Sequence, residues 1–317
     1  MIERKMGAAT RDAYGKALVE IGKENPDVIV LDADLSKSTK TEMFQKVYPD
    51  RFIDVGIQEM NLVGVAAGLA SCGKVPFISS FACFLMNKGY EQLRVGVSFS
   101  EQNVKVVASH GGISVGEDGA SQQSVEDFAL ACTLPHFTVM VPADEFSAKS
   151  LIKQCASQKG PFYVRTGRAK APIIYNEKTE FKIGKAIKLR DGKDVTLVAT
   201  GLLVFEALEA ADLLKADGID AAVVDVHTLK PLDEELLITE AKKTGAFVVA
   251  EEHLVFGGLG SAVSQLVSRR QPIPMEFIGM QDTYAESGKA QELMEKYGLT
   301  SKNIVQQAKK VVSRKSR

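Results

Sequence analysis

Short runs of apolar, often β-branched residues alternate along the chain with longer segments of helical periodicity. In the first half, the apolar runs cover residues 28–34, 52–56, 75–81, 104–110, 137–143 and 162–166. Helical patterns lie between them at residues 58–71, 88–98, 121–133 and 145–157. Each apolar run is continuous rather than alternating, as expected for strands that are covered on both faces. This order predicts an α/β fold made of βαβ units around a mostly parallel sheet.

The same alternation resumes in the second half after a weaker stretch. Residues 169–194 contain Pro172, two glycines and scattered charges, which indicates a linker. Strands are predicted beyond it at residues 195–201, 221–226, 247–251 and 275–278, and helices at residues 203–215, 233–243, 257–268 and 289–297. We therefore expect two doubly wound α/β domains with mostly parallel sheets, at residues 1–168 and 195–317. The basic end, residues 309–317, is expected to be a solvated helix end that frays.

The composition argues against some classes of binding partner. The 39 basic and 40 acidic residues give a net charge of −1, so no charge excess attracts nucleic acid or an anionic membrane. No apolar run approaches the roughly 20 residues that span a bilayer, and the first residues lack the apolar core of a signal peptide. We expect a cytoplasmic protein. Reduced, buried thiols rather than disulfides or zinc ligands are expected at Cys72, Cys83, Cys132 and Cys155.

A polar, glycine-rich loop follows the predicted strand at residues 104–110. It holds four glycines within residues 111–119, which permit close backbone approaches that side chains would block. Ligands of open parallel sheets bind beyond the carboxyl ends of the strands, where this loop lies. The glycine spacing fits neither the Rossmann fingerprint nor the P-loop. The residues alone leave two interpretations open: a ligand site, or an irregular loop that caps the next helix with Ser121 as its N-cap.

Two further strand ends carry candidate chemistry. Glu59 lies in the first turn of a largely apolar helix, where the helix dipole alone favours a carboxylate. A helix that is apolar nearly all round is also buried, which would place Glu59 in a low-dielectric setting where it can donate or share a proton. Phe81 and Phe84 follow the next strand and could stack against a flat ring, although such a pair ordinarily packs in the core.

These three segments occur together, and in this order, in a known pattern. Over nearly its full length the chain resembles transketolase, but only the pyrimidine-binding and C-terminal domains of that enzyme. The resemblance rests on residues 9–15, 34–39, 54–61 and 80–84, the Gly-Glu-Asp-Gly loop at 116–119, residues 165–175, and Lys-Pro-Leu-Asp at 230–233. Each motif alone is weak, whereas the ordered set is specific.

The resemblance implies a thiamine diphosphate enzyme. Glu59 looks like the catalytic glutamate that hydrogen-bonds N1′ of the aminopyrimidine and favours the imino tautomer, which removes the thiazolium proton. Phe81 and Phe84 look like walls of the aminopyrimidine pocket, and Ile113 looks like a further cofactor contact. The sequence departs from the family at Asn87, where many relatives have an aromatic residue.

The resemblance also implies sugar contacts. His110 looks like the catalytic histidine near the reacting hydroxyl and carbonyl oxygens, and Asp118 like a contact to a sugar hydroxyl. Gln122 stands where bacterial and yeast transketolases have histidine, and in this it is similar to the animal enzymes. Glutamine can donate and accept hydrogen bonds but cannot titrate.

A phosphate-binding cluster is implied by the same resemblance, at Arg11, Ser38 and Arg168. An arginine fork suits bidentate phosphate recognition, although each arginine taken separately reads as a surface charge. His136, His227 and His253 match no catalytic position and are expected to be structural or surface residues. Residues 251–253, Glu-Glu-His, are a weak metal motif because adjacent strand residues point to opposite faces, so no metal ligand is expected in this chain.

The family's diphosphate-binding domain, which carries a Gly-Asp-Gly segment, has no counterpart here. The resemblance therefore implies a partner, the N-terminal transketolase subunit, which would hold the diphosphate and Mg²⁺ (or Ca²⁺) in a heterotetramer. The implied reaction moves a two-carbon ketol unit from a ketose phosphate, such as xylulose 5-phosphate, to an aldose phosphate in the non-oxidative pentose phosphate pathway. The alternatives are a 2-oxo acid dehydrogenase beta subunit, a deoxyxylulose-phosphate-synthase-like enzyme, and a non-catalytic scaffolding subunit.

Overall fold

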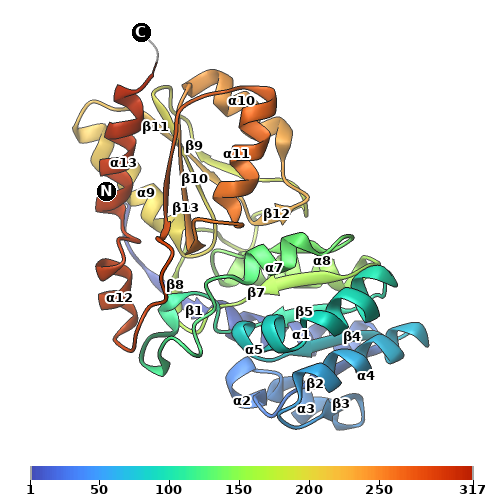
Figure 1. Cartoon of the computed structure of the whole chain (residues 1–317). Helices are drawn as coiled ribbons and strands as arrows, with labels where there is room; N and C mark the ends of the chain where they lie inside the picture. The colour runs from blue at the N-terminus through green and yellow to red at the C-terminus, as the bar shows by residue number, and fades with distance from the viewer. Residues whose placement is uncertain (1, 316–317) are drawn as a thin grey trace.

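The computed structural model describes residues 2–315, which fold into two α/β units stacked on each other (Figure 1). The first unit contains a seven-stranded sheet and the second a five-stranded sheet. Helices cover both faces of each sheet, so the predicted fold class is confirmed. Within the described residues, no helix has the length and apolarity needed to cross a membrane.

The seven-stranded sheet has the order β12-β6-β7-β5-β4-β2-β3. Its six parallel strands are β2 (Val28–Asp32), β3 (Phe52–Asp54), β4 (Val75–Ser79), β5 (Lys105–Ala108), β6 (Thr138–Met140) and β7 (Phe162–Arg165). All six were predicted, and each is shorter than predicted. Three of the strands end early because the chain turns at residues with positive φ: Asp34 (61°), Gly56 (75°) and His110 (58°).

The helices of this unit agree with prediction in part. The predicted helices at residues 58–71 and 145–157 are α4 (Glu59–Ser71) and α8 (Glu145–Ser157). In the region predicted at 88–98 lie the end of α5 (Ala82–Lys88), α6 (Tyr90–Gln92) and the π-helical segment η2 (Leu93–Phe99). The helix predicted at residues 121–133 begins later than predicted: α7 extends over Asp127–Thr133, and Glu126 is its N-cap. Ser121 therefore caps no helix.

Several elements of the first unit, most of them short, escaped prediction. They are β1 (Met6–Ala9), α1 (Thr10–Glu24), α2 (Ser36–Thr39), α3 (Glu42–Val47) and the 3₁₀ segments η1 (Pro49–Arg51) and η3 (Ile113–Asp118). The glycine-rich loop is thus partly ordered as η3. In this respect the prediction of an irregular loop was incomplete.

The five-stranded sheet has the order β14-β13-β10-β11-β9. Its predicted strands are β10 (Val195–Ala199), β11 (Ala221–Asp225), β13 (Phe247–Leu254) and β14 (Met275–Met280). The predicted helices are α9 (Leu203–Ala216), α10 (Glu234–Thr244), α11 (Leu259–Arg270) and α12 (Ala290–Lys296). A further helix, α13 (Ser301–Ser313), includes much of the predicted frayed end, of which residues 316–317 lie outside the described part.

The predicted linker at residues 169–194 contributes strands to both units. Strand β8 (Lys170–Pro172) pairs antiparallel with β1, and β9 (Ile187–Arg190) pairs antiparallel with β11. A strand of the second half, β12 (Thr228–Lys230), in turn pairs with β6 of the first sheet. The two units are therefore joined by strand β12 as well as by the connecting chain.

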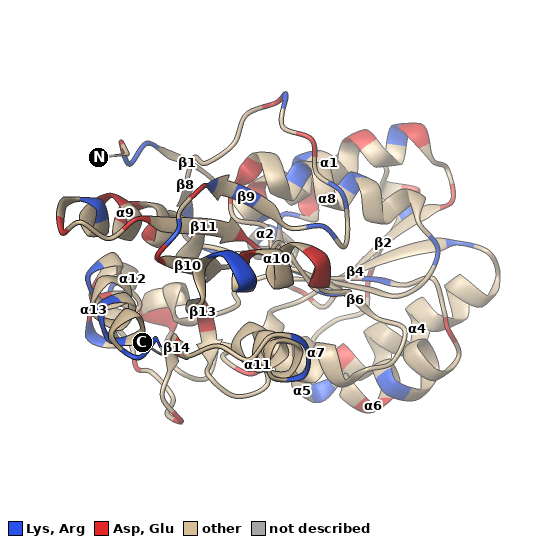
Figure 2. Ribbon diagram, turned by 90° about the horizontal axis from the view of Figure 1, so that it is seen from above, with Lys and Arg blue, Asp and Glu red and all other residues tan. Residues whose placement is uncertain are grey.

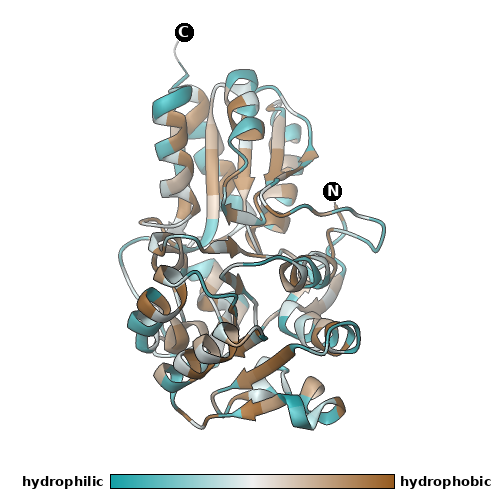
Figure 3. Ribbon diagram, turned by 90° about the vertical axis from the view of Figure 1, so that its right-hand side faces the viewer, coloured by the Kyte–Doolittle hydropathy of each residue, from teal (hydrophilic) through white to brown (hydrophobic). Residues whose placement is uncertain are grey.

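Apolar residues concentrate in the two sheets, whereas the polar residues gather on the outer helices and loops (Figure 3). Charged residues likewise lie mainly on the helices and loops around the strands, which are largely tan (Figure 2). Two clusters of buried apolar side chains each include residues of both sheets. Cys83 and Cys155 are buried free thiols and Cys132 is partly buried, but Cys72 is exposed, contrary to the prediction, because it follows the exposed end of α4.

Candidate active site

The candidate residues converge on one edge of the first sheet. Its parallel strands β2, β3, β4, β5 and β7 end at this edge, and the loops that follow them carry the side chains. Those side chains are Ser38, Glu59, Phe81, His110 and Arg168. An open parallel sheet binds ligands beyond the carboxyl ends of its strands, so this edge is the expected location of a site.

Glu59 is buried in the first turn of α4, with 3% of its surface exposed. The hydroxyl of Ser80, directly after β4, donates to its Oε1 over 3.2 Å. The ammonium of Lys88, at the end of α5, lies 3.6 Å from its Oε2. These partners offset the cost of burying a carboxylate. Neither partner was predicted; the only sequence signal for Ser80 is its place at a strand end.

Three rings form a continuous stack beside Glu59. The ring centroids of Phe81 and Phe84 are 5.5 Å apart with the planes 16° from parallel, and Phe81 and His110 are 3.7 Å apart at 20°. A ring inserted between Phe81 and Phe84 would need about 7 Å, twice the contact distance of two carbon atoms. The two phenylalanines therefore form one shared aromatic surface rather than two facing walls.

His110 is held as a neutral imidazole. A guanidinium nitrogen of Arg11 lies 3.3 Å from its Nε2, and the hydroxyl of Ser109 lies 2.8 Å from its Nδ1. Because a guanidinium only donates, Nε2 accepts and the ring proton is assigned to Nδ1. Burial lowers the pKa of His110 to about 3, and the positive charges of Arg11 and Arg168 act in the same direction. His110 is thus uncharged near neutral pH.

Positive charge gathers next to this imidazole. Arg11 also donates to the main-chain carbonyl of Ser38 over 2.9 Å, and its Nε is buried without a hydrogen-bond partner. Burial lowers the pKa of Arg11, although a guanidinium remains protonated. Arg168 donates to the carbonyl of Val115 over 2.8 Å and to Glu117 over 3.2 Å. Two guanidinium groups and an unused buried donor suit an anionic ligand.

Asp118 and Gln122 lie on the glycine-rich loop at the rim of the site. Asp118 is exposed, with its Oδ1 4.0 Å from a guanidinium nitrogen of Arg168. Gln122 accepts at its side-chain oxygen from Ser121 over 2.5 Å, and its main-chain carbonyl accepts from the thiol of Cys83 over 3.3 Å. The loop is therefore in contact with helix α5, which carries Phe84.

Two residues singled out by resemblance have other surroundings. Ile113 is fully buried in a core cluster, so it supports the loop from within and offers no exposed side-chain surface to a cofactor. Asn87, at the position where an aromatic residue is common, donates to the carbonyl of Cys83 and to Glu126, both over 2.8 Å. It fastens α5 to the start of α7.

A buried polar network that was not predicted lies beneath the loop. Arg165 pairs with Asp127, which also accepts from the hydroxyl of Tyr163 over 2.5 Å. Burial raises the pKa of Tyr163, while the pairing with Arg165 outweighs burial and lowers the pKa of Asp127. Arg165 also donates to the carbonyl of Glu252 over 2.7 Å. The network joins β7 and α7 to β13 of the second unit.

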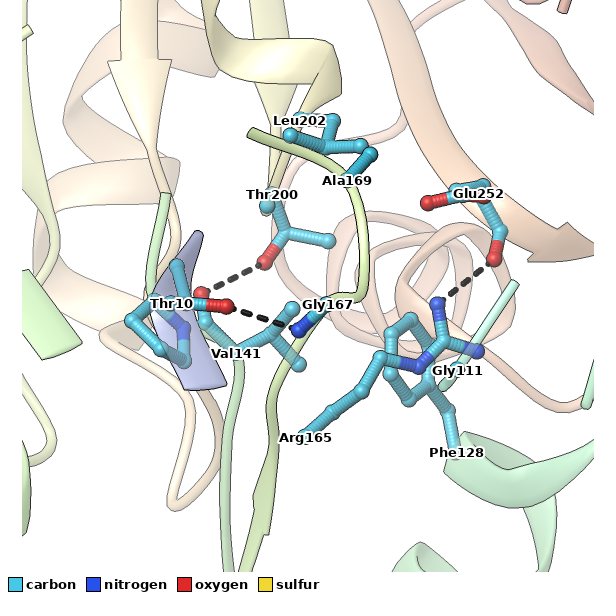
Figure 4. A pocket seen from close by; sticks show the side chains of 12 residues that line it. Thr10, Gly111, Phe128, Val141, Arg165, Gly167, Ala169, Thr200, Leu202 and Glu252 are labelled. Carbon is cyan, nitrogen blue, oxygen red and sulfur yellow. Dashed lines mark hydrogen bonds between the residues drawn. The ribbon is translucent and has the colours of Figure 1, made fainter. Parts of the chain in front are cut away.

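A small cavity between the two units lies next to this network (Figure 4). Arg165, Thr10 and Glu252 are among its lining residues, and its volume is about 20 Å³. That is room for about one water molecule. The cavity is therefore a packing gap at the domain boundary and too small for a sugar phosphate.

Side chains of the weak metal motif at residues 251–253 contact main-chain groups. The carboxylate of Glu251 accepts from the main-chain amides of Leu259 and Gly260 at the start of α11. His253 contacts the carbonyl of Leu254 at its Nδ1 and the amide of Ala129 at its Nε2. Among residues 2–315, no group of three or more His, Cys, Asp and Glu side chains is arranged to hold a metal ion.

Comparisons with known proteins agree with this arrangement. The chain matches the family model "Transketolase, pyrimidine binding domain" over residues 6–173 and "Transketolase, C-terminal domain" over residues 184–304. It is 45% identical over 298 residues to a putative transketolase C-terminal section from Methanocaldococcus jannaschii, which covers 93% of each chain. It is 42% identical over 306 residues to a 6-deoxy-6-sulfo-D-fructose transketolase subunit from Clostridium sp. (strain MSTE9), covering 96% of this chain and 95% of that protein.

A solved structure is similar as well. It is described as "split gene transketolase, inactive beta4 tetramer", with a TM-score of 0.92 and 49% sequence identity over 98% of this chain and 100% of that one. The family models and the similar proteins extend over nearly the whole sequence, so the chain belongs to the transketolase family and contains its pyrimidine-binding and C-terminal domains.

Proposed function

We propose that this chain is the C-terminal subunit of a thiamine diphosphate-dependent transketolase. In the proposed reaction, a two-carbon ketol unit passes from a ketose phosphate to an aldose phosphate. The observation that carries the proposal is the convergence, at one sheet edge, of a buried glutamate, an aromatic surface, a neutral histidine and two arginines: Glu59, Phe81 with Phe84, His110, and Arg11 with Arg168. A cytoplasmic location and the non-oxidative pentose phosphate pathway remain part of the proposal.

The residues present fit the aminopyrimidine of thiamine diphosphate. The buried carboxylate of Glu59 has only a hydroxyl and a half-exposed ammonium as side-chain partners, so it is suited to a ring nitrogen. Phe84, the partly exposed outer ring of the stack, offers an apolar surface beside it, and Phe81 supports this ring from within. When bound, thiamine diphosphate supplies the nucleophilic carbon that carries the two-carbon unit. The protein supplies orientation, hydrogen bonds and charge.

The substrate contacts follow from the charges and donors of the site. His110 presents a neutral imidazole that orients a sugar oxygen by hydrogen bonding when the sugar takes the place of Arg11 at its Nε2. Arg11 and Arg168, with Ser38, hold the sugar phosphate through their guanidinium groups. Asp118 accepts a hydrogen bond from a sugar hydroxyl, and Gln122 contacts the sugar from the same rim.

The proposal includes a partner subunit. The diphosphate and Mg²⁺ (or Ca²⁺) would be held by an N-terminal subunit with a Gly-Asp-Gly segment, in a heterotetramer with two copies of each chain. Two exposed apolar side chains flank Glu59: Ile57, 68% exposed, and Met60, 52% exposed. Large apolar side chains exposed beside an incomplete site indicate a surface covered by another chain. The similarity to a protein described as a split-gene transketolase supports the same arrangement.

The identity of the sugar substrate is a further part of the proposal. Xylulose 5-phosphate is the donor that we expect, with an aldose phosphate as acceptor. A relative 42% identical to this chain is named for 6-deoxy-6-sulfo-D-fructose, in which a sulfonate stands in the place of the phosphate. Arginines also bind a sulfonate, so the substrate panel should include both anions.

The test is reconstitution. The purified chain is mixed with an N-terminal subunit encoded in the same genome, thiamine diphosphate and Mg²⁺, and ketol transfer from xylulose 5-phosphate is assayed. We expect activity in the mixture and none in either protein alone. Replacing Glu59 by alanine should lower kcat by about 10²- to 10⁴-fold, the usual contribution of a positioned proton-transfer group.

Two controls accompany this variant. Glu20→Gln, which alters an exposed ion pair with Lys149, should leave activity unchanged. Analytical ultracentrifugation should show that Glu59→Ala still assembles with the partner. Near-normal turnover by Glu59→Ala would refute the assignment of the cofactor site.

A further inference from the structure

The glycine-rich loop of the first unit rests directly on the second unit. The segment at residues 281–289, which joins β14 to α12, lies against η3, and Figure 1 shows the red α12 beside this green loop. A Cβ atom at Gly116 would lie 3.3 Å from the carbonyl oxygen of Gly288, and one at Gly119 would lie 2.5 Å from the hydroxyl of Ser287. Both loop glycines also have positive φ. The positive φ favours glycine at both positions, and the close approach of the Gly288 carbonyl adds to this at Gly116.

One side chain ties the loop to this segment. Gln123 is 3% exposed, and its Nε2 lies 3.4 Å from the carbonyl oxygen of Ile113, 3.3 Å from that of Gly116 and 3.1 Å from that of Glu286. Because carbonyl oxygens only accept, the amide presents its NH₂ group to all three, and its two hydrogens are shared among them. The first two carbonyls belong to the loop and the third to the second unit. We name this set of contacts the Gln123 clamp.

A second attachment lies at the start of the loop. Glu252, at the end of β13, accepts from the main-chain amide of Ser114 over 2.6 Å. A Cβ at Gly112 would lie 2.2 Å from the Glu252 carboxyl group, so this approach also requires glycine. The main chain of the loop is thus fixed by the second unit at both ends of η3.

The clamped segment carries or supports the proposed substrate contacts. Asp118 is the last residue of η3, and Arg168 donates to the carbonyl of Val115 within it. A shift of η3 would therefore move the proposed hydroxyl acceptor and one proposed phosphate ligand together. Misplacement by about 1 Å is enough to weaken a positioned contact severely.

We propose that the second unit is part of the substrate-positioning apparatus, and that Gln123 is the positioning residue that transmits its support to Asp118 and Arg168. The substrate side of this inference rests on the proposed function, since it assumes that the loop binds sugar phosphate. The claim that Gln123 holds the loop against the second unit does not rest on the proposed function, because the clamp joins the two units in the isolated chain.

The test uses Gln123→Met, which conserves volume and removes the donor. Hydrogen exchange of the cofactor-free chain should show amides at residues 113–119 exchanging about tenfold faster, the effect of losing roughly one hydrogen bond. In the reconstituted complex, the KM for sugar phosphate should rise about tenfold, while kcat and the Kd for thiamine diphosphate stay within about twofold. Gln281→Ala, in the same segment but outside the clamp, should match the wild type in each measurement.

Ser287→Phe tests the same coupling from the second unit, and it keeps the test decisive if Gln123→Met does not fold. Its bulk should separate the segment from Gly119 and produce the same faster exchange and higher KM. Unchanged exchange at residues 113–119 in a folded variant would overturn the clamp. A fall in kcat without a change in KM would overturn the positioning role. Absence of ketol transfer by the wild-type complex would refute the proposed function, and hydrogen exchange would still decide the clamp.

Discussion

At the scale of single residues, the position of a residue at a strand end can be predicted from the sequence, but the partners of its side chain cannot. Glu59 could be singled out because it follows a predicted strand, and His110 because the resemblance assigns it a role at a strand end; the structure brings both to one sheet edge. Ser80, Lys88 and Gln123 could not be assigned their contacts in the same way. Their roles depend on distances between separate elements, which no local pattern encodes.

His110 carries a residue-scale prediction. Because burial lowers its pKa to about 3, the imidazole should remain neutral across the range of about pH 5 to 8 in which histidines ordinarily titrate. We expect ¹⁵N NMR of the labelled chain to show a neutral ring with its proton on Nδ1 throughout that range. In the complex, His110→Ala should lower kcat/KM by about 10²-fold or more without moving the inflections of the pH profile.

Protonation of His110 near neutral pH would contradict this prediction. If the ring gained a proton between about pH 5 and 8, burial and the charges of Arg11 and Arg168 would not hold it neutral as their positions indicate. His110→Gln serves as the matched variant, since it keeps a neutral side chain with a donor and an acceptor. It should retain more activity than His110→Ala.

At the scale of elements, the direction of a strand decided what could be predicted. The parallel strands of both sheets were found, whereas β1, β8, β9 and β12 pair antiparallel: β1 with β8 in a two-stranded sheet, and β9 and β12 at the edges of the larger sheets. Their neighbours, not their own sequences, make them strands. Helix α1 was missed although Ala13, Ala17 and Ile21 recur at helical spacing and are buried.

Helix α4 carries an element-scale prediction that rests on the proposed partner. Its exposed Met60 lies one residue beyond Glu59, and the neighbouring η2 exposes Phe99. We expect Met60→Lys to weaken association with the N-terminal subunit at least about fivefold, because an apolar hot-spot contact contributes more than 1 kcal/mol. Met60→Leu, which keeps the surface apolar, should bind like the wild type.

Sedimentation velocity of the mixed subunits measures this effect. Circular dichroism of the isolated chain checks that the fold is retained, as expected for a substitution at a half-exposed side chain. Equal affinity of Met60→Lys and Met60→Leu for the partner would exclude this face of α4 from the interface.

At the scale of the whole molecule, the boundary between the units was the hardest feature to foresee. The weak pattern at residues 169–194 predicted a linker, but this segment instead makes paired strands and polar contacts with both units. Asp144, the N-cap of α8, accepts from the main-chain amides of Ile174 and Tyr175. The hydroxyl of Tyr175 donates to Asp225 of the second sheet over 2.6 Å. The segment thereby connects a helix cap of one unit to a strand end of the other.

The buried carboxyl group of Asp225 makes the stability of the protein decrease as pH rises. Burial raises the pKa of Asp225 to about 7, the nearby charge of Asp144 adds to the shift, and the hydrogen bond from Tyr175 opposes it. The native state thus binds a proton more tightly than the unfolded state does. The contribution of Asp225 to stability is present at low pH and is lost as pH rises from about 4 to about 7, because an unfolded aspartate has a pKa near 3.9.

Asp225→Asn should remove this dependence. The asparagine oxygen still accepts from Tyr175 but cannot ionise, so the free energy of unfolding of the variant should improve relative to wild type by up to about 1.4 kcal/mol per pH unit across that window. Urea unfolding at several pH values measures the difference. Tyr175→Phe should extend the window to higher pH, since it removes the hydrogen bond that favours the carboxylate. Parallel curves for wild type and Asp225→Asn would show that Asp225 is already ionised in the native state at low pH and that the buried contact is an ordinary charged hydrogen bond.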